Sequence, residues 1–409
     1  MSTRRLTLVL AGLAMIGPFA IDTYLPSFLS IARHYEVSAL MMQQTLSVYL
    51  FTSATMTLFY GTMSDTFGRR PVILGALALF AGASIGAALA PTFGWLLVFR
   101  ALQGLCAGAG MVVGQAIVRD RFHGAAAQRM MSNIMMVFGI APAVAPVLGG
   151  YLNTHLGWQA NFVFLAGFAA LLLLVCLRAL PESLPRAQRH PLHLGTILGN
   201  YATAIRHPEF RLGVFAIGTA FIGFALYIAS AANFVLQVLH LPETAFAWLF
   251  VPMIGGMVLG SATGARLAHR LAPSTLIRAG LSVMAGAAFI NLVYNALFVA
   301  AVPWAVLPVL LYTFGTALAL PAMAVITQGL FPAMRGLAAS LQNFVQMMIF
   351  ALVSGFVAPL LFGSAFKLAL GMAAGVLLSA GCWYASAARP PQPERRTSAS
   401  TDRPDLDRQ

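Results

Sequence analysis

The sequence predicts an all-α integral membrane protein, with twelve transmembrane helices in two pseudo-symmetric six-helix bundles. The first observation is composition: 59% of the 409 residues are hydrophobic, 9% are charged and the mean hydropathy is +0.83, against roughly 25% charged residues in soluble domains. The second is that the apolar stretches are long and continuous rather than alternating, which excludes an outer-membrane β-barrel. The third is an internal repeat, in which short motifs of the first half of the chain return in the second half.

Twelve apolar stretches have the length of transmembrane helices, which need about 20 residues each. They lie at residues 6–29, 43–63, 72–90, 93–117, 131–153, 160–180, 211–234, 246–268, 275–299, 303–328, 337–361 and 366–388. The sequence therefore predicts an N-terminal bundle at 1–181, a cytoplasmic central loop at 182–209 and a C-terminal bundle at 210–388. The tail at 389–409 is rich in Pro, Arg, Ser and Asp, and we expect it to be disordered.

The matching motifs in the two halves are separated by a constant number of residues. Gln115 and Gln328 are 213 residues apart, and the Ala-Pro-x-Leu-x-Gly segment at 145–150 returns at 358–363. Two halves that repeat in parallel are typical of transporters that bind substrate between the halves, near the middle of the membrane.

Basic residues lie almost entirely on one side of the predicted membrane. With both ends of twelve spans on one side, 21 of the 24 Lys and Arg residues fall on that side. The exceptions are Arg33 and Lys367 on the far side and Arg100 within a span. Because cytoplasmic loops carry the excess of basic residues, both termini are predicted to be cytoplasmic. This placement also accounts for the net charge of +13 without a nucleic-acid partner.

A charged loop at 61–71 joins the second and third predicted spans. Its notable residues are Gly61, Asp65, Gly68, Arg69 and Arg70. The arginines could simply anchor this hairpin to the cytoplasmic side. The pattern resembles the G-x-x-x-D-x-x-G-R-R/K signature of major facilitator superfamily transporters. That resemblance implies a latch that closes the inner side, with Arg119 as a further member. We expect Asp65 to lie at the positive N-terminal end of the helix that follows Arg335.

Asp22 and Arg100 are the charged side chains predicted to lie well inside spans. A charge in a span is costly and usually faces a cavity or a partner, so both are functional candidates. Their distances from Ser30 and Phe93 place them about 10–12 Å from the outer ends of their spans. They could form a static ion pair between two helices. Alternatively, Asp22 exchanges a proton with substrate or water, because burial opposes a charged carboxylate while a nearby arginine favours it.

Further motifs resemble one branch of that superfamily. The Asp-x-Tyr-Leu-Pro segment at 22–26 is typical of the Bcr/CflA branch of drug:proton antiporters, named for bicyclomycin and chloramphenicol resistance. Residues 100–104 resemble its R-x-x-Q-G motif, and residues 141–150 resemble the fifth-span antiporter motif in this branch's form. The Gly-Trp at 157–158 and the Leu-Pro-Glu at 180–182 match the flanks of span six.

Three positions depart from the usual pattern. Ala145 stands before Pro146 where the superfamily usually has Gly, Thr66 replaces a frequent basic residue and Gln159 replaces a common Arg. These departures weaken the inference of substrate more than the inference of family.

The resemblance implies a proton-coupled multidrug antiporter of the bacterial inner membrane that works by alternating access. Its expected substrates are neutral or weakly charged lipophilic drugs of the chloramphenicol or bicyclomycin type, and proton coupling is assigned to Asp22 and Arg100. In the fifth span, Pro and Gly residues allow bending and close packing, although ordinary packing explains the glycines equally well. The residues assigned to gating there are Gly139, Pro142, Pro146, Gly149 and Gly150.

Polar side chains in several spans are candidates for substrate contact. They are Tyr24, Gln115, Asn133, Tyr227, Gln342, Asn343 and Gln346. Gln342 and Gln346 are one helical turn apart. Each of these side chains could equally form a hydrogen bond between helices.

The expected partners are small-molecule drugs, protons and the lipid bilayer, with a monomer as the functional unit. No cofactor is expected, because the proton gradient supplies the energy. The sequence has no His-Glu-x-x-His motif and no paired carboxylates within spans, which argues against an enzyme. The alternative function is an exporter or symporter of a small metabolite on the same fold.

Overall fold

Regular structure in the described part of the chain is helical throughout. The computed structural model describes residues 3–189 and 194–388, and these residues form no strand. The N-terminal half consists of α1 (Thr3–Asp22), η1 (Leu25–Ser27), α2 (Phe28–His34), α3 (Ala39–Phe67), α4 (Arg69–Ala88), α5 (Phe93–Ala107), α6 (Ala109–Arg121), α7 (Gly124–Leu156) and α8 (Gln159–Ala179). The tail predicted at 389–409 lies outside the described residues.

The C-terminal half has more interruptions in its helices. Its elements are α10 (Pro208–Ala220), α11 (Ile222–Ala229), α12 (Ala231–Asn233), η3 (Phe234–Val238), η4 (Glu243–Phe246), α13 (Ala247–Leu267), α14 (Pro273–Leu297), α15 (Leu307–Gly329), η5 (Pro332–Met334), α16 (Arg335–Leu352), η6 (Val353–Val357), α17 (Ala358–Leu361) and α18 (Ala365–Ala387). The short η2 (Arg186–Gln188) and the helix α9 (Leu194–Arg206) lie between the halves. A helix therefore occupies part of the stretch for which the sequence predicts a loop.

Eleven helices in the described residues are long and apolar enough to cross a membrane. The remaining predicted span, at 43–63, is the 29-residue α3. Its threonine, serine and tyrosine side chains lower its hydropathy, and it packs against α5 in its own half and α16 in the other. Polar groups within the membrane are tolerated where they pair with other helices, so α3 completes the twelve-helix arrangement.

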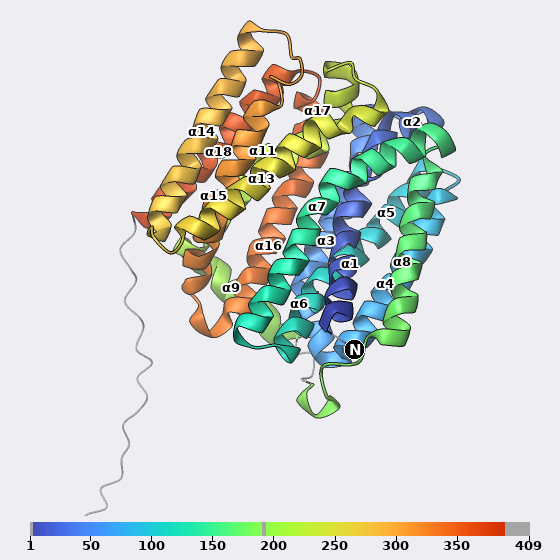
Figure 1. The fold of residues 1–409 in the computed structure, drawn as a ribbon, viewed down its shortest axis with the longest axis vertical. Coiled ribbons are helices and arrows are strands. Elements are labelled where there is room, and N and C mark those ends of the chain that lie inside the picture. Colours follow the sequence, from blue (N-terminus) through green and yellow to red (C-terminus); the bar gives the residue numbers. More distant parts are fainter. Residues whose placement is uncertain (1–2, 190–193, 389–409) are drawn as a thin grey trace, which may run out of the picture.

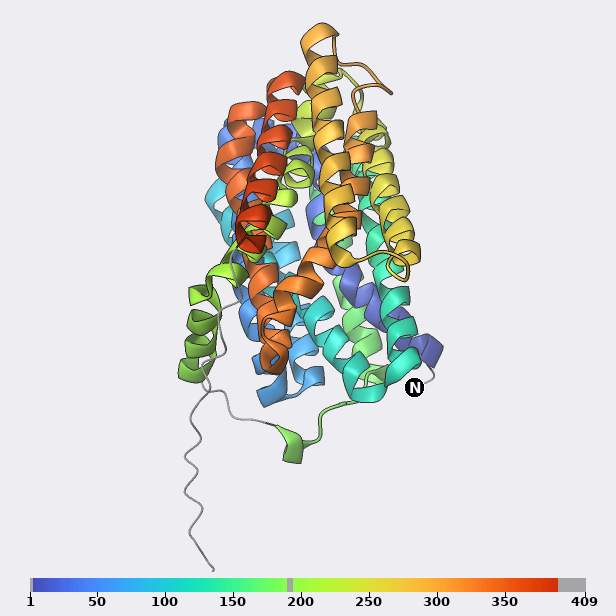
Figure 2. The same ribbon diagram turned by 90° about the vertical axis from the view of Figure 1, so that its left-hand side faces the viewer.

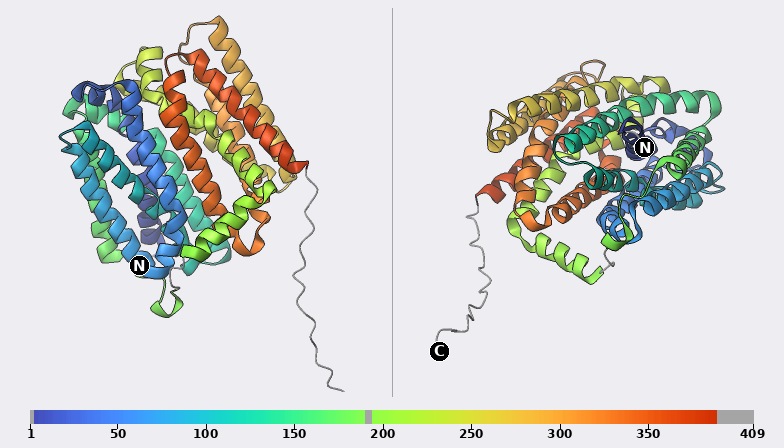
Figure 3. Two further views of the ribbon diagram at one scale, coloured as in Figure 1. Left: turned by 180° about the vertical axis from the view of Figure 1, so that it is seen from behind. Right: turned by 60° about the horizontal axis from the view of Figure 1, so that its bottom comes forward.

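The helices form two bundles that lie side by side (Figure 1). We call the end at which α1 begins and α18 ends the proximal end, and the opposite end the distal end. The side view in Figure 2 shows the N-terminus near the proximal end. The bundles meet where α3 packs on α16 and α7 packs on α13, and the view from behind shows α3 beside α16 (Figure 3).

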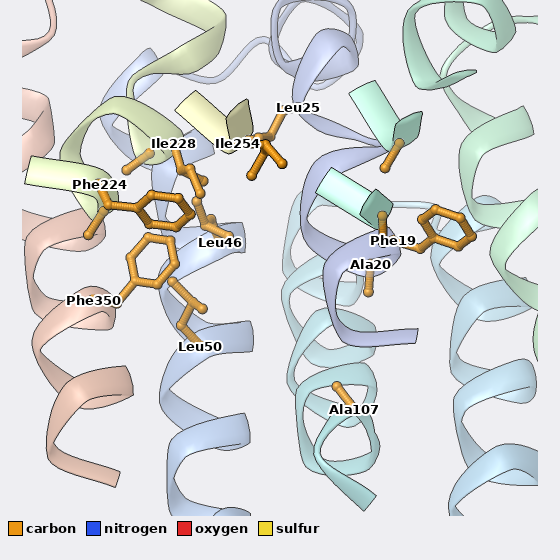
Figure 4. Packing of buried hydrophobic residues seen from close by; sticks show 14 of the residues in the cluster. Phe19, Ala20, Leu25, Leu46, Leu50, Ala107, Phe224, Ile228, Ile254 and Phe350 are labelled. Carbon is orange, nitrogen blue, oxygen red and sulfur yellow. The ribbon is translucent and has the colours of Figure 1, made fainter. Parts of the chain in front are cut away.

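An apolar cluster fills the junction between the bundles toward the distal end. Leu46 and Leu50 of α3 face Phe224, Ile228 and Phe350 of the C-terminal half (Figure 4). All five side chains are buried. The junction is therefore sealed by protein side chains at this level.

Candidate functional site

The guanidinium of Arg100 lies inside the N-terminal bundle and is fully buried. Its Nη1 donates to the Ala20 carbonyl at 3.0 Å and to Gln103 Oε1 at 2.8 Å, and its Nε donates to the Thr45 carbonyl at 3.3 Å. Ala20 belongs to the last turn of α1, where a cation is favoured by the negative end of the helix dipole. Arg100 thus ties α5 to the C-terminal end of α1 and to α3.

Two tyrosine rings enclose the same guanidinium. The Cζ of Arg100 lies 4.2 Å from the ring centre of Tyr24 and 4.3 Å from that of Tyr49, which is cation–π geometry. Gln103 extends the network by donating from Nε2 to Ser84 Oγ at 2.8 Å. The sequence predicts Arg100 and Tyr24 as site residues. It does not single out Tyr49 or Ser84, because nothing near them in the chain distinguishes them from packing residues.

Asp22 is the last residue of α1, and only 2% of it is exposed. Its Oδ1 is buried and makes no hydrogen bond. Within the described residues, the ion pairs join Arg69 to two carboxylates and Arg189 to Glu182, all at the proximal end. The static Asp22–Arg100 ion pair that the sequence leaves open is therefore not formed in this structure.

Two of the other polar candidates pair within the C-terminal half. Asn291 donates from Nδ2 to the hydroxyl of Tyr227 at 2.8 Å. Gln328 donates from Nε2 to Gln342 Oε1 at 3.0 Å. Here both candidates act as hydrogen-bond partners between helices.

The remaining polar candidates do not join the Arg100 network. Asn133 and Asn343 are exposed, whereas Gln115 and Gln346 are half-buried. The structure therefore brings together Tyr24, Arg100 and the end of α1, and leaves the other predicted substrate contacts dispersed.

The predicted latch loop forms a compact network around Arg69. Arg69 Nη1 lies 2.5 Å from Asp65 Oδ1 and donates to Ser64 Oγ at 2.6 Å, and its Nε donates to Asp120 Oδ2 at 3.1 Å. Gly68 has φ = 100°, a conformation that favours glycine, and lies between α3 and α4. Asp65 thus pairs within its own half, where the sequence predicts contact with the start of α16.

Glu182 provides a carboxylate for the start of α4. It accepts hydrogen bonds from the backbone N–H groups of Arg69 at 3.0 Å and Arg70 at 3.3 Å, which suits the positive end of the helix. Arg70 also donates from Nη2 to the Leu177 carbonyl at 2.8 Å. Arg119, predicted as a latch member, is exposed, and its neighbour Asp120 holds Arg69 instead.

The glycines of the antiporter motif differ in their surroundings. A side chain at Gly149 would overlap the Thr23 carbonyl next to Asp22, and one at Gly150 would overlap the Glu243 carbonyl of the other half. A Cβ at Gly139 or Gly61 would meet nothing within 4 Å. Pro142 and Pro146 lie inside the continuous helix α7. Close approach of helices therefore accounts for Gly149 and Gly150.

Hydrogen bonds across the two halves gather at the distal end and form what we call the distal seal. Three α3 side chains donate to the C-terminal half: Gln43 to the Ala229 carbonyl (2.7 Å) and Ser354 Oγ (3.2 Å), Gln44 to the Gly355 carbonyl (3.0 Å) and Ser47 to the Ala351 carbonyl (2.8 Å). Most of these acceptors lie in or beside the π-helical turn η6, which interrupts regular α-helical bonding. Asn153 of α7 adds a bond to Glu243 at 2.6 Å.

Two helical bundles that meet at a hydrogen-bonded seal, with ionisable side chains buried among their helices, define a membrane transport protein. The sequence model of the Major Facilitator Superfamily matches residues 8–354, and the chain belongs to that superfamily. It is therefore a multi-pass membrane transporter and not an enzyme.

Curated relatives include named drug-resistance proteins. The chain is 31% identical over 284 residues to a bicyclomycin resistance protein homolog of Haemophilus influenzae, which covers 69% of this chain and 71% of the relative. It is 29% identical over 257 residues to multidrug resistance protein D of Escherichia coli, with 63% and 64% covered.

Solved transporter structures share the fold. The crystal structure of a D-xylose-proton symporter superposes with a TM-score of 0.73 at 17% identity, covering 94% of this chain and 98% of the symporter. A bacterial homolog of the human lysosomal transporter Spinster gives a TM-score of 0.69 at 16% identity, with 94% and 98% covered.

Proposed function

We propose that the protein is a proton-coupled exporter of lipophilic drugs across the bacterial inner membrane, and that it works by alternating access as a monomer. The observation that carries this proposal is Asp22, a buried carboxyl group without an ionic partner. Transport proteins use such groups in proton relays. The names of the relatives support drugs as the substrates.

The environment of Asp22 suits a group that gains and loses a proton. Burying an ionised carboxylate without a partner is costly, so the burial of Asp22 favours its protonated form. Carbonyl groups and Gln103 accept hydrogen bonds from Nη1 and Nε of Arg100, and two tyrosine rings face its guanidinium, while its buried Nη2 has no hydrogen-bond partner among the described residues. Opening of the distal side protonates Asp22, and drug entering from the proximal side displaces that proton.

The network around Arg69 at the proximal end and the distal seal at the opposite end are suited to be gates on opposite sides of the membrane. The excess of basic residues at the proximal end supports a cytoplasmic location for that end, and the distal seal is then the outer gate. When the outer side opens, Asp65 moves from Arg69 toward the positive N-terminus of α16 and closes the inner side. Gly149 and Gly150 let α7 move against α1 and η4 without side chains in the way.

The small number of charged side chains buried within the spans favours neutral or weakly charged substrates. Arg100 is a fully buried basic side chain well inside a span, and its Nη1 and Nε already contact protein acceptors, whereas its Nη2 has no hydrogen-bond partner in the described part of the chain. A strongly anionic substrate would need further cationic groups. Chloramphenicol and bicyclomycin types of compound fit this requirement, and a small neutral metabolite is the alternative substrate class.

The test is drug export in inverted membrane vesicles with and without a proton gradient. We compare the wild type, Asp22→Asn and the matched control Glu36→Gln, which changes an exposed acid at the distal end. The drug panel starts with chloramphenicol and includes chemically unrelated compounds. Gradient-dependent export that is lost in Asp22→Asn and kept in Glu36→Gln is the expected result.

Two outcomes contradict the proposal. Full gradient-driven export by Asp22→Asn would show that another group carries the proton. Absence of transport for every drug, with correctly inserted wild-type protein, would favour the metabolite carrier on the same fold.

A further inference from the structure

The helix α9 carries two distinct faces between the bundles. Ala204 is fully buried and Tyr201 is half-buried against the protein, where α9 packs on α10 and α16. Leu198 is 55% exposed and Ile205 is 42% exposed. Because these two residues are seven apart, they share one side of the helix. An exposed apolar flank thus lies beside the buried face of the helix.

The depth of α9 follows from the hydrogen bond of Tyr201. Its hydroxyl donates to the Leu58 carbonyl of α3 at 3.0 Å, and it also interacts with Ser340 of α16. Leu58 lies nine residues before Phe67, the last residue of α3, which is about 13 Å along the helix axis. The helix therefore lies beside the transmembrane bundle rather than beneath it, as the green helix near the proximal end in Figure 2 shows.

Basic side chains lie where α9 leads into α10. Arg206 and Arg211 are both exposed, and Glu209 between them is half-buried. An apolar flank with adjacent arginines is the composition of a helix that lies in the membrane interface. Each arginine near an anionic membrane surface adds about 1 kcal/mol of attraction, which corresponds to roughly fivefold in binding.

We propose that α9 is an interfacial helix that inserts Leu198 and Ile205 among the acyl chains of the inner leaflet and places Arg206 and Arg211 against anionic phospholipid headgroups. This inference rests on the cytoplasmic orientation proposed above for the proximal end. Since Tyr201 touches α3 of one half and α16 of the other, the lipid-bound helix also bridges the two halves at the inner leaflet.

Spin labels test the position of the apolar flank directly. Single cysteines at Leu198, Ile205 and the control Thr203, an exposed polar residue on another side of α9, are labelled in a background without Cys106, Cys176 and Cys382. The proteins are reconstituted in phosphatidylcholine vesicles with and without phosphatidylglycerol. Power saturation then compares accessibility to oxygen, which enriches in lipid, with accessibility to a water-soluble nickel chelate.

We expect labels at 198 and 205 to be at least threefold more accessible to oxygen, relative to nickel, than the label at 203. Equal nickel accessibility at all three positions would overturn the proposal, because α9 would then lie in water. This measurement does not depend on drug transport, so it can fail while the transport proposal stands.

A second comparison tests the headgroup contact. Phosphatidylglycerol should increase the lipid immersion of the label at 198. The double variant Arg206→Gln/Arg211→Gln should abolish that increase, whereas Arg278→Gln, an exposed arginine at the start of α14, should keep it. An unchanged response in the double variant would refute the role of the two arginines.

Discussion

Replacement of Gln43 by Leu should release the distal seal. The Gln43 side chain is 1% exposed, and its Nε2 donates to the Ala229 carbonyl at 2.7 Å and to Ser354 Oγ at 3.2 Å. A hydrogen bond contributes about 0.5–1.5 kcal/mol net, so loss of two costs about 1–3 kcal/mol. Because both bonds cross between the halves, the cost falls on the sealed state alone. The population ratio of distally open to sealed protein should rise about 5- to 150-fold.

Distance measurements between spin labels report that ratio. Leu89 of the N-terminal half and Val299 of the C-terminal half are exposed near the distal end, so the separation of labels at these positions should increase when the distal seal opens. Double electron–electron resonance in vesicles gives the fraction of each distance. Gln237→Leu is the matched control, since Gln237 is exposed and accepts a hydrogen bond from Asn233 within its own half.

The reasoning is refuted if Gln43→Leu leaves the distance distribution of the wild type unchanged. The same holds if Gln237→Leu shifts it equally, because the effect would then not come from bonds across the halves.

Three further substitutions test individual contacts. Gly150→Val should clash with the Glu243 carbonyl of the other half, disfavour the sealed state by about 1–3 kcal/mol and raise thiol labelling at the distal end, whereas Gly139→Val, in open space, should not. Equal thiol labelling of the two variants would contradict this prediction. Glu182→Gln weakens charged hydrogen bonds at the start of α4 and should lower the midpoint of thermal unfolding by an amount equivalent to about 1 kcal/mol, whereas Glu36→Gln should not. An unchanged midpoint would contradict the stabilising role of Glu182 at the start of α4. Arg100→Lys cannot reproduce the fork of donors and should reduce drug transport at least tenfold at equal expression, so transport at the wild-type rate would disprove its structural role.

The sequence predicts the architecture because membrane burial constrains composition over long stretches. Each of the twelve apolar stretches corresponds to a helix or a run of helical pieces, and α9 lies in the polar stretch between halves. Asp22 and Arg100 are predictable as buried charges for the same reason, since a charge within an apolar stretch is rare. Their arrangement is not predictable, because the distance between two helices depends on packing over the whole bundle.

Contacts between segments far apart in sequence account for most of what the sequence does not reveal. Gln43 and Tyr49 carry no local signal, and they become notable only when α3 packs on α16 and α5. Asp120 and Glu182 act on the start of α4 across more than fifty residues of chain. The repeated Ala-Pro segment also differs between halves: in α7 it lies within a continuous helix, whereas at Ala358 it follows the π-helical turn η6.

The end of α1 links the charged site to the distal seal. Arg100 donates a hydrogen bond to the Ala20 carbonyl, and Asp22 is the last residue of α1. The carbonyl of the following residue, Thr23, packs against Gly149 of α7. One residue further along α7, Gly150 packs against the Glu243 carbonyl of the other half. In the proposed cycle, a change in the charge of Asp22 therefore acts on a helix end that touches α7, the helix that contributes Asn153 to the distal seal. The proposed coupling needs no ion pair between Asp22 and Arg100, because the backbone at the end of α1 and the two glycines of α7 connect the proposed proton site to the distal seal.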